Sequence, residues 1–298
     1  MTSESTLLRF RAMGTAVSVI GPDVSGSRAA ARATEAVRTV FEREEDRFSR
    51  FRPESELTKV NEAAGRDTRL SPGFAALLRR ALEGAERTAG LFDPTVLPAL
   101  RAAGYDRDFD EVLEGARGAL HPAVPCGRWR AVHLDGLHLR MPEGVALDFG
   151  GIAKGWTVDR GAEAAVRAGL PWALVNAGGD LRLAGEAPDV TIAVEDPGNP
   201  DTECARLHLS SGALATSSIT TRAWGDGLHH LIDPRSGKPT AGDVVQATVW
   251  ARSCAHAEVL AKAAIVGGRS AVAHVPAAVV TVDGDLVLSM SMAQGMAA

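Results

Sequence analysis

The stretch Ala146-Leu147-Asp148-Phe149-Gly150-Gly151-Ile152-Ala153-Lys154-Gly155-Trp156-Thr157-Val158-Asp159 combines an apolar lead-in, a carboxylate, two glycines and a lysine. The lead-in predicts a strand near residues 145–149, and Lys154 stands where a helix extending to residue 168 should begin. At such a junction the free backbone N–H groups and the helix dipole point at one position, which favours an anion. The alternative is a plain turn between a strand and a helix.

The composition narrows the class of protein. The chain has 298 residues, of which 45% are hydrophobic, so it can bury one large core or two modest ones. Its net charge is −5 with both signs interspersed, which argues against nucleic acid or an anionic membrane as a partner. We find no stretch of transmembrane length, no apolar leader at the N-terminus, and no metal or disulfide pattern in the three cysteines. These features predict a cytoplasmic protein without a membrane anchor.

The apolar periodicity predicts an α+β fold. The first part contains a strand pair or a bent strand over residues 7–20, broken at Met13-Gly14-Thr15, and a long helix over 27–48. Ser71-Pro72 supplies an N-cap and a first helical residue for a second helix that Gly90 ends. The second part is richer in strands: a hairpin over 131–141, strands near 172–176, 190–194, 228–232 and 244–250, helices over 154–168 and 254–266, and a last hairpin at Asp283-Gly284.

We expect these elements to form a single α+β unit over residues 1–298, either as one body or as two lobes. A short helix is predicted over 110–120. The Pro-rich stretch 121–127 that follows it is the one linker candidate that the sequence offers. The tail from about residue 290 to residue 298 has no periodicity and is expected to fray.

Two further turns carry acidic residues. Asn176-Ala177-Gly178-Gly179-Asp180 repeats the order of strand, glycine pair and acid. Gly90-Leu91-Phe92-Asp93-Pro94-Thr95 joins the C-terminal cap of a helix to a rigid Asp-Pro turn. Each is adequately explained as a tight turn, so neither defines a site by itself.

A histidine pair precedes another Asp-Pro turn in Leu228-His229-His230-Leu231-Ile232-Asp233-Pro234-Arg235-Ser236-Gly237. If Leu228 points into the core, strand alternation puts His230 on the same face and turns His229 away. A histidine at a strand end can act as a general base, because its pKa lies near neutrality. The alternative is a buried histidine with a purely structural role.

The helix over 254–266 is almost entirely apolar, which predicts that it is buried. Glu258 and Lys262 are four residues apart on this helix and share a face. On a solvated helix they would form an ordinary ion pair, contributing about 0.2–0.5 kcal/mol. On a buried helix a charge pair needs further polar partners, which favours a role in a site.

Taken in order, these motifs resemble the FAD:protein FMN transferases, the flavinyltransferase family often called ApbE. The resemblance covers nearly the whole chain and rests on the order of the motifs, since each one alone is weak. It implies a T-fold-like unit with mixed sheets and flanking helices. The matching stretches are Met13-Gly14-Thr15, Phe48-Ser49-Arg50-Phe51, Ser55-Glu56-Leu57 with Asn61, Gly90 to Thr95, Asp148 to Gly155, Asn176 to Asp180, Ala215-Thr216-Ser217 and His230 to Gly237.

The resemblance implies that the chain moves the FMN half of FAD onto a threonine hydroxyl of an acceptor flavoprotein, forming a phosphoester and releasing AMP. It implies that His230 takes the proton from this threonine. Met13 and Phe51 would flank the isoalloxazine ring, which suits a polarizable thioether and an aromatic face. The remaining FAD contacts that it implies are Asp93, Pro94, Thr95, Asp148, Lys154 and Ile232.

The resemblance also implies a Mg²⁺ ion, held by the Gly151 carbonyl together with an Asp and a Thr of the helix over 254–266. In this sequence those two positions are Glu258 and Lys262. Glu keeps an oxygen ligand, but an ammonium offers only donors and repels a cation. Either the Lys262 ammonium takes the place of the metal beside Glu258, or the chain binds FAD without transferring FMN. A third class is an FAD pyrophosphatase, in which water replaces the threonine and the products are FMN and AMP.

Overall fold

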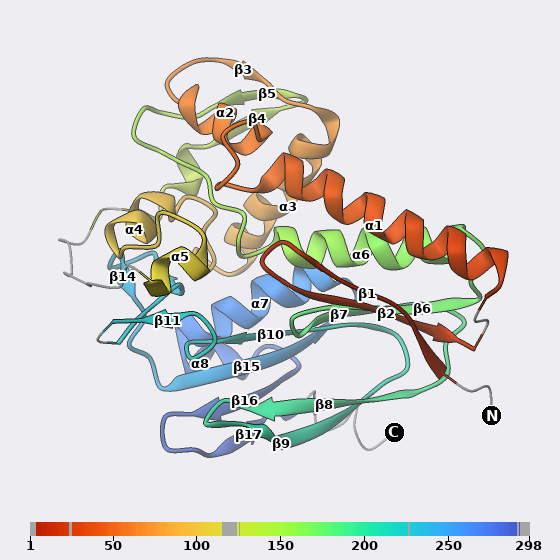
Figure 1. The fold of residues 1–298 in the computed structure, drawn as a ribbon. Coiled ribbons are helices and arrows are strands. Elements are labelled where there is room, and N and C mark those ends of the chain that lie inside the picture. The colour runs from red at the N-terminus through yellow and green to blue at the C-terminus, as the bar shows by residue number, and fades with distance from the viewer. Residues whose placement is uncertain are drawn as a thin grey trace.

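The computed structural model describes residues 4–23, 26–114, 124, 126–225, 227–290 and 292. It shows helices stacked on one face of a large sheet, so the predicted α+β class is confirmed (Figure 1). Every pairing between the described strands is antiparallel, so the sheets are not mixed in strand direction. The four long helices stand where the periodicity placed them, as α1 (Arg28–Phe48), α3 (Pro72–Arg87), α6 (Ala153–Arg167) and α7 (Cys254–Gly267).

The large sheet has eight strands in the order β1-β2-β6-β7-β10-β15-β16-β17. Helices α6 and α7, with α1 outside α6, cover one face, and the hairpin of β8 and β9 lies on the other (Figure 1). The strands are β1 (Glu4–Ala12), β2 (Thr15–Pro22), β6 (Trp172–Ala177), β7 (Asp180–Gly185), β10 (Gly212–Ser218), β15 (Val244–Ala251), β16 (Ala277–Thr281) and β17 (Leu286–Leu288), and those of the hairpin are β8 (Val190–Asp196) and β9 (Asn199–Leu209).

The two faces of the sheet bury different side chains, because successive strand residues point to opposite faces. On β6, Ala173 and Val175 belong to the cluster formed with α1 and α6. Trp172 and Leu174 belong to the cluster formed with β8 and β9. None of the four is more than 4% exposed, so β6 is a central strand buried on both sides.

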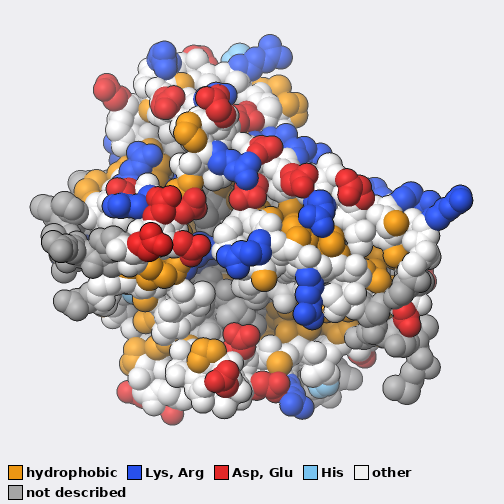
Figure 2. Space-filling model, viewed as in Figure 1, with side chains coloured by type: hydrophobic (Ala, Val, Ile, Leu, Met, Phe, Trp, Pro, Cys, Tyr) orange, Lys and Arg blue, Asp and Glu red, His pale blue; other side chains and the backbone are white. Residues whose placement is uncertain are grey.

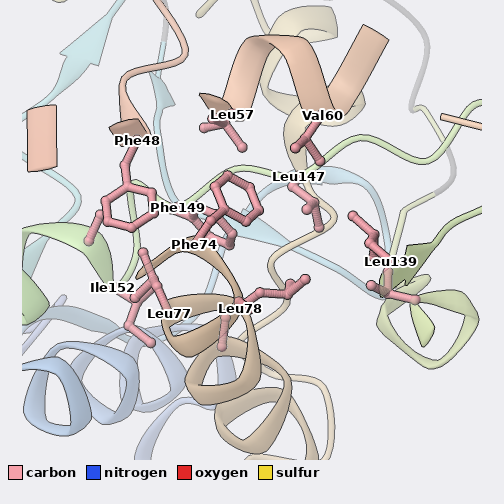
Figure 3. Packing of buried hydrophobic residues seen from close by; sticks show 14 of the residues in the cluster. Phe48, Leu57, Val60, Phe74, Leu77, Leu78, Leu139, Leu147, Phe149 and Ile152 are labelled. Atoms are coloured by element: carbon pink, nitrogen blue, oxygen red, sulfur yellow. The ribbon is translucent and has the colours of Figure 1, made fainter. Parts of the chain in front are cut away.

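A second core surrounds Phe149, beside the layered sheet. The ring centroids of Phe48 and Phe74 lie 5.7 and 5.3 Å from that of Phe149 (Figure 3). Such edge-to-face ring pairs contribute about 0.5–1.5 kcal/mol beyond their buried area. Phe149 therefore anchors the glycine turn that follows it. The other elements around this core are α2 (Glu56–Glu62), α3, β3 (Thr68–Arg69), and the predicted hairpin of β4 (His133–Asp135) and β5 (His138–Arg140).

Short elements complete the described part of the chain. The helix predicted over 110–120 begins at Phe109 and is described to Glu114. Its remainder, most of the stretch 121–127 and most of the tail after 290 lie outside the described residues. Across the described ranges, no helix combines the length and apolar character needed to cross a membrane. The short elements are α4 (Leu97–Ala102), α5 (Phe109–Glu114), a 3-10 helix (Trp129–Ala131), β11 (Ala223–Trp224), β12 (Leu228–His229), β13 (Ile232–Asp233), β14 (Lys238–Pro239) and α8 (Arg269–Val272).

The sheet strand predicted near 145–149 is wrong. Among the described residues this segment pairs with no strand, and its backbone pairs with a side chain and a loop instead. Asn61 Nδ2 donates to the Leu147 carbonyl over 2.9 Å, and the Leu147 N–H donates to Asn61 Oδ1 over 2.7 Å. The Asp148 N–H donates to the Pro94 carbonyl over 2.8 Å. The apolar run indicates correctly that this segment is buried. A buried backbone needs hydrogen-bond partners, but these need not belong to a neighbouring strand.

The single strand predicted over 228–232 is also wrong, because β12 and β13 belong to different two-stranded sheets. His230 lies at the break between them, which reverses the predicted orientations. His229 is buried, at 5% exposure, and His230 lines a cleft. Strands β7, β9 and β10 and helices α2 and α4 were not predicted from the sequence.

Asn61→Ala would leave the N–H and the carbonyl of Leu147 buried without partners. We expect the free energy of unfolding to fall by about 2–4 kcal/mol, since each buried unsatisfied group costs about 1–3 kcal/mol. Urea denaturation followed by circular dichroism measures this change. Asn199→Ala, at an exposed position, is the control and should shift stability by less than about 0.5 kcal/mol. Equal effects of the two substitutions would contradict the role given to Asn61.

Candidate functional site

One cleft collects most of the predicted site residues. Its volume is about 440 Å³, and it extends from α4 and α5 across the glycine turn to the start of α6. Clefts of this size, lined by rings and a few polar groups, are typical of small-molecule sites. Pro94, Thr95 and Glu258 are buried behind the lining residues. The predicted residues that line the cleft are Met13, Phe51, Asp93, Asp148, Gly151, Lys154, His230, Ile232 and Lys262.

The first turns of α6 and α7 touch each other at one side of the cleft. We call this the α6–α7 contact. Gly155 lies so close to α7 that an added Cβ would be 2.6 Å from the Cys254 carbonyl oxygen. Asp159, one turn further along α6, accepts the backbone N–H groups of Cys254 and Ala255 at 2.8 and 3.0 Å. Helix α6 therefore supplies the N-terminal cap of α7, and the two helices are held in one relative position.

Glu258 is held inside the α6–α7 contact and is 1% exposed. Its Oε2 accepts the Gly155 N–H over 2.9 Å, and its Oε1 accepts from Lys262 Nζ over 3.1 Å. A carboxylate at the N-terminus of α6 is favoured by the helix dipole. The sequence predicted that this helix start would face an anion. At the Gly155 N–H that anion is the carboxylate of the protein's own Glu258.

Lys154 is paired with Asp180, which follows the second glycine turn. Its Nζ donates to the Asp180 carboxylate and, over 3.2 Å, to the Ala177 carbonyl. Burial lowers the pKa of Lys154, but the carboxylates of Asp180 and Glu258 outweigh it, so the pKa lies above its usual value. Lys154 is therefore charged at neutral pH. Its pairing brings the turns 148–155 and 176–180 together in space.

Asp148 is paired with Arg50, which the sequence placed in a motif but not in the site. Arg50 Nε lies 3.2 Å from Asp148 Oδ2, and the two side chains are 9% and 8% exposed. The guanidinium carbon of Arg50 lies 4.5 Å from the ring centroid of Phe51 and 4.2 Å from that of Tyr105. Arg50 thus connects the aromatic end of the cleft to the carboxylate that begins the glycine turn.

The Asp-Pro turn at 93–95 is held by hydrogen bonds between its own residues. Asp93 Oδ1 accepts the backbone N–H and the hydroxyl of Thr95 at 2.6 and 2.5 Å. Thr95 Oγ1 in turn accepts the Arg128 N–H at 2.9 Å. Burial raises the pKa of Asp93, against the opposing hydrogen bonds from Thr95 and Trp129. Pro94 and Thr95 therefore shape the cleft from behind, and Asp93 is the member of this turn that lines it.

The two adjacent histidines differ in their ring hydrogen bonds. His229 uses both nitrogens, since Nε2 donates to the Thr240 carbonyl over 3.0 Å and Nδ1 accepts the Leu231 N–H over 3.2 Å. His230 Nδ1 lies 3.4 Å from the Arg222 carbonyl, which can only accept. This nitrogen therefore carries the hydrogen, and Nε2 is the acceptor. Burial, reinforced by the charge of Arg222, holds the pKa of His230 well below 6.5. A neutral imidazole able to take a proton lines the cleft.

Several residues of the cleft were not predicted as site residues. Arg50, which lines the cleft, and Asp180, which is buried and pairs with the lining residue Lys154, lie in motifs that the sequence singled out, so a signal for them existed. Tyr105 and Arg222 stand in no motif and are brought to the cleft by the fold. Figure 2 shows acidic side chains gathered over α4 and α5. At and next to the start of α5, Asp108, Asp110 and Glu111 line the cleft.

The architecture defines an α+β protein whose cleft lies beside a helix N-terminus. The chain matches the ApbE family over residues 13–280 and belongs to this family, so the resemblance is confirmed. A protein named FAD:protein FMN transferase from Treponema pallidum is 29% identical over 260 residues, covering 79% of this chain and 71% of that protein. A protein of the same name from Rhodobacter capsulatus is 30% identical over 222 residues, covering 72% of this chain and 42% of that protein.

Solved structures share the fold along the whole chain. The ApbE protein of Thermotoga maritima has a TM-score of 0.84 and 26% identity, and the match covers 99% of both chains. The apo form of the Pseudomonas stutzeri flavinyl transferase ApbE has a TM-score of 0.82 and 21% identity, covering 100% of this chain and 98% of that one.

Two substitutions on α6 test the α6–α7 contact. Gly155→Ala should lower the free energy of unfolding by about 1–3 kcal/mol, because overpacking against α7 outweighs the gain in helix propensity. Gly161→Ala, on the same helix, meets only side chains at 3.3 Å and beyond, so its propensity gain should keep stability within about 1 kcal/mol of the parent. Thermal and urea denaturation measure both. The contact is not rigid if Gly155→Ala is as stable as Gly161→Ala.

Proposed function

We propose that this chain is an FAD:protein FMN transferase, which moves the FMN half of FAD onto a threonine hydroxyl of an acceptor flavoprotein. The observation that carries this proposal is the neutral His230 imidazole in the same cleft as the Asp148–Gly155 turn and the Lys262 ammonium. A proton acceptor and a cation in one cleft suit the transfer of a phosphoryl group to a hydroxyl. The names of the relatives from Treponema pallidum and Rhodobacter capsulatus support the same activity.

The aromatic end of the cleft would take the isoalloxazine ring. Met13 and Phe51 both line the cleft, and Arg50 holds Phe51 through a cation–π contact. Ile232 lines the cleft two residues after His230, so it would contact the flavin half near the reacting hydroxyl. The diphosphate would then lie toward Lys262 and the glycine turn. This orientation puts the flavin on apolar and aromatic groups and the phosphates on donors.

The proposed reaction is an in-line substitution at phosphorus. The threonine Oγ attacks the phosphorus of the FMN phosphate, and the Oγ–P bond forms as the P–O bond to the AMP phosphate breaks. His230 Nε2 takes the hydroxyl proton, and AMP leaves with the bonding electron pair. Nδ1–H of His230 donates to the Arg222 carbonyl, which fixes the ring with its acceptor available.

The Mg²⁺ ion implied by the family resemblance does not fit the residues present. Both oxygens of Glu258 already accept hydrogen bonds, one from the Gly155 N–H and one from Lys262. A divalent ion beside Gly151 would face an ammonium that repels it and offers no lone pair. The proposed reaction therefore contains no metal-bound step.

One assay separates this function from the two alternatives. The chain is incubated with FAD, with and without a threonine-bearing acceptor peptide, and AMP and covalent flavin fluorescence are followed. AMP together with labelled peptide supports the transferase. AMP with free FMN identifies an FAD pyrophosphatase, and FAD binding without either product identifies a flavin-binding protein.

The cytoplasmic location expected from the N-terminal sequence stays a prediction.

His230→Ala should lower the rate of FMN transfer by about 10²–10⁴-fold, the usual contribution of a general base. FAD affinity should change little, because the substitution removes an imidazole and no charge at neutral pH. In-gel flavin fluorescence measures transfer, and quenching of free FAD measures binding. His208→Ala, at an exposed position, is the control. Retention of the parent rate in His230→Ala would refute the assignment of the base.

The pH dependence of transfer follows from the lowered pKa of His230. A base with a depressed pKa stays neutral, and so active, to lower pH than a free histidine. The acid limb of kcat/KM should therefore lie below pH 6.5. Initial rates between about pH 4.5 and about pH 8 locate this limb, and the window brackets the ordinary range of histidine. A limb centred at or above the ordinary histidine value would contradict the buried geometry of His230.

A further inference from the structure

We propose that the Lys262 ammonium, held by Glu258, is the fixed cation that binds the diphosphate of FAD in this chain, so that FMN transfer needs no divalent metal. This inference rests on the proposed function. It assigns a phosphate-binding role to Lys262, which stands at a position where the family resemblance implies a metal ligand. It makes Lys262 a residue that contacts the substrate and Glu258 a positioning residue.

The position of Lys262 supports this role. Its side chain is 15% exposed and lines the cleft, whereas that of Glu258 is 1% exposed and lies behind it. The ammonium has three N–H groups, and the hydrogen bond to Glu258 over 3.1 Å uses one of them. The remaining N–H groups are available to phosphate oxygens in the cleft.

Gly151 makes room for the lysine stem. A Cβ added to Gly151 would lie 3.0 Å from Lys262 Cδ and 3.3 Å from its Cε. The stem therefore runs along the backbone of the glycine turn, at the place where the resemblance put a metal-binding carbonyl. A side chain at 151 would also meet Phe92 Cε2, at 2.8 Å, so it could displace the lysine stem and with it the ammonium.

Glu258 keeps the ammonium in place. Its second oxygen is fixed by the Gly155 N–H, so the carboxylate cannot turn without giving up a buried hydrogen bond. The other lysine that lines the cleft, Lys154, is engaged by Asp180 and the Ala177 carbonyl. A cation that is oriented before the substrate arrives needs no free energy of reorganisation during the reaction. Fixed charges stabilise developing charge best under this condition.

The test uses a double variant, Glu258→Gln/Lys262→Met. Removing Lys262 alone would leave a buried carboxylate without its partner and so risk unfolding the protein. Glu258→Gln keeps an oxygen for the Gly155 N–H while it removes the charge. The matched control is Glu54→Gln/Lys59→Met, an exposed pair at 3.0 Å. Circular dichroism and the melting temperature establish that each variant is folded before it is assayed.

The first measurement is the rate of FMN transfer in excess EDTA and in Mg²⁺. The parent protein and the control should transfer equally in both, within about twofold. The Glu258→Gln/Lys262→Met variant should lose about 10²–10³-fold in rate, the usual effect of removing one fixed charge donor, and Mg²⁺ should not restore it. Loss of parent activity in EDTA that Mg²⁺ restores would overturn the inference, as would parent-like transfer by the variant.

The second measurement is binding in EDTA, which needs no turnover. Fluorescence quenching should show that the Glu258→Gln/Lys262→Met variant binds FAD at least about tenfold more weakly, because a charge-assisted contact to phosphate is lost. Riboflavin, which has no phosphate, should bind both proteins alike. If the parent transfers no FMN, the proposed function fails, and this comparison alone decides the role of Lys262. Equal loss for FAD and riboflavin, or no loss for either, would refute that role.

Discussion

The close contact between the first turns of α6 and α7 is the constraint on which the cleft depends. Gly155 allows the two backbones to approach, since any side chain there would collide with the Cys254 carbonyl. Asp159 then caps α7 from α6, and Glu258 of α7 accepts a backbone N–H from α6. Each helix thus supplies polar partners for the other. Lys262, one turn beyond Glu258, is thereby placed against the glycine turn.

The charges of the cleft are arranged in pairs because buried charge must be neutralised. Arg50 pairs with Asp148, Lys154 with Asp180, and Lys262 with Glu258. The first two pairs join elements that are far apart in the sequence, the third lies within α7, and together they leave the glycine turn bordered by fixed cations. Charges held in this way are already oriented by the fold before a ligand arrives.

Much of the fold follows from local patterns. Ser71 caps its helix as predicted, and the alternation broken at Met13-Gly14 is the turn of a strand pair, one of the two readings it allowed. The two wrong strands share a physical cause, because apolar alternation reports burial and not the identity of the hydrogen-bond partner. Near 145–149 that partner is the side chain of Asn61, which lies 86 positions away in the chain. Such a partner leaves no trace in the local sequence.

The sequence by itself determined the class of fold, the family, and the presence of a histidine and a charged pair in the site. The chemistry of these residue types and the order of their motifs are local properties of the chain. Only the tertiary structure decided which histidine reaches the cleft, because the break after β12 buries His229 in the core and turns His230 into the lining of the cleft. It also decided that the Glu258 carboxylate accepts hydrogen bonds from Lys262 and from the Gly155 N–H at the start of α6. That outcome depends on how closely two helices approach, which is set by packing across the whole core.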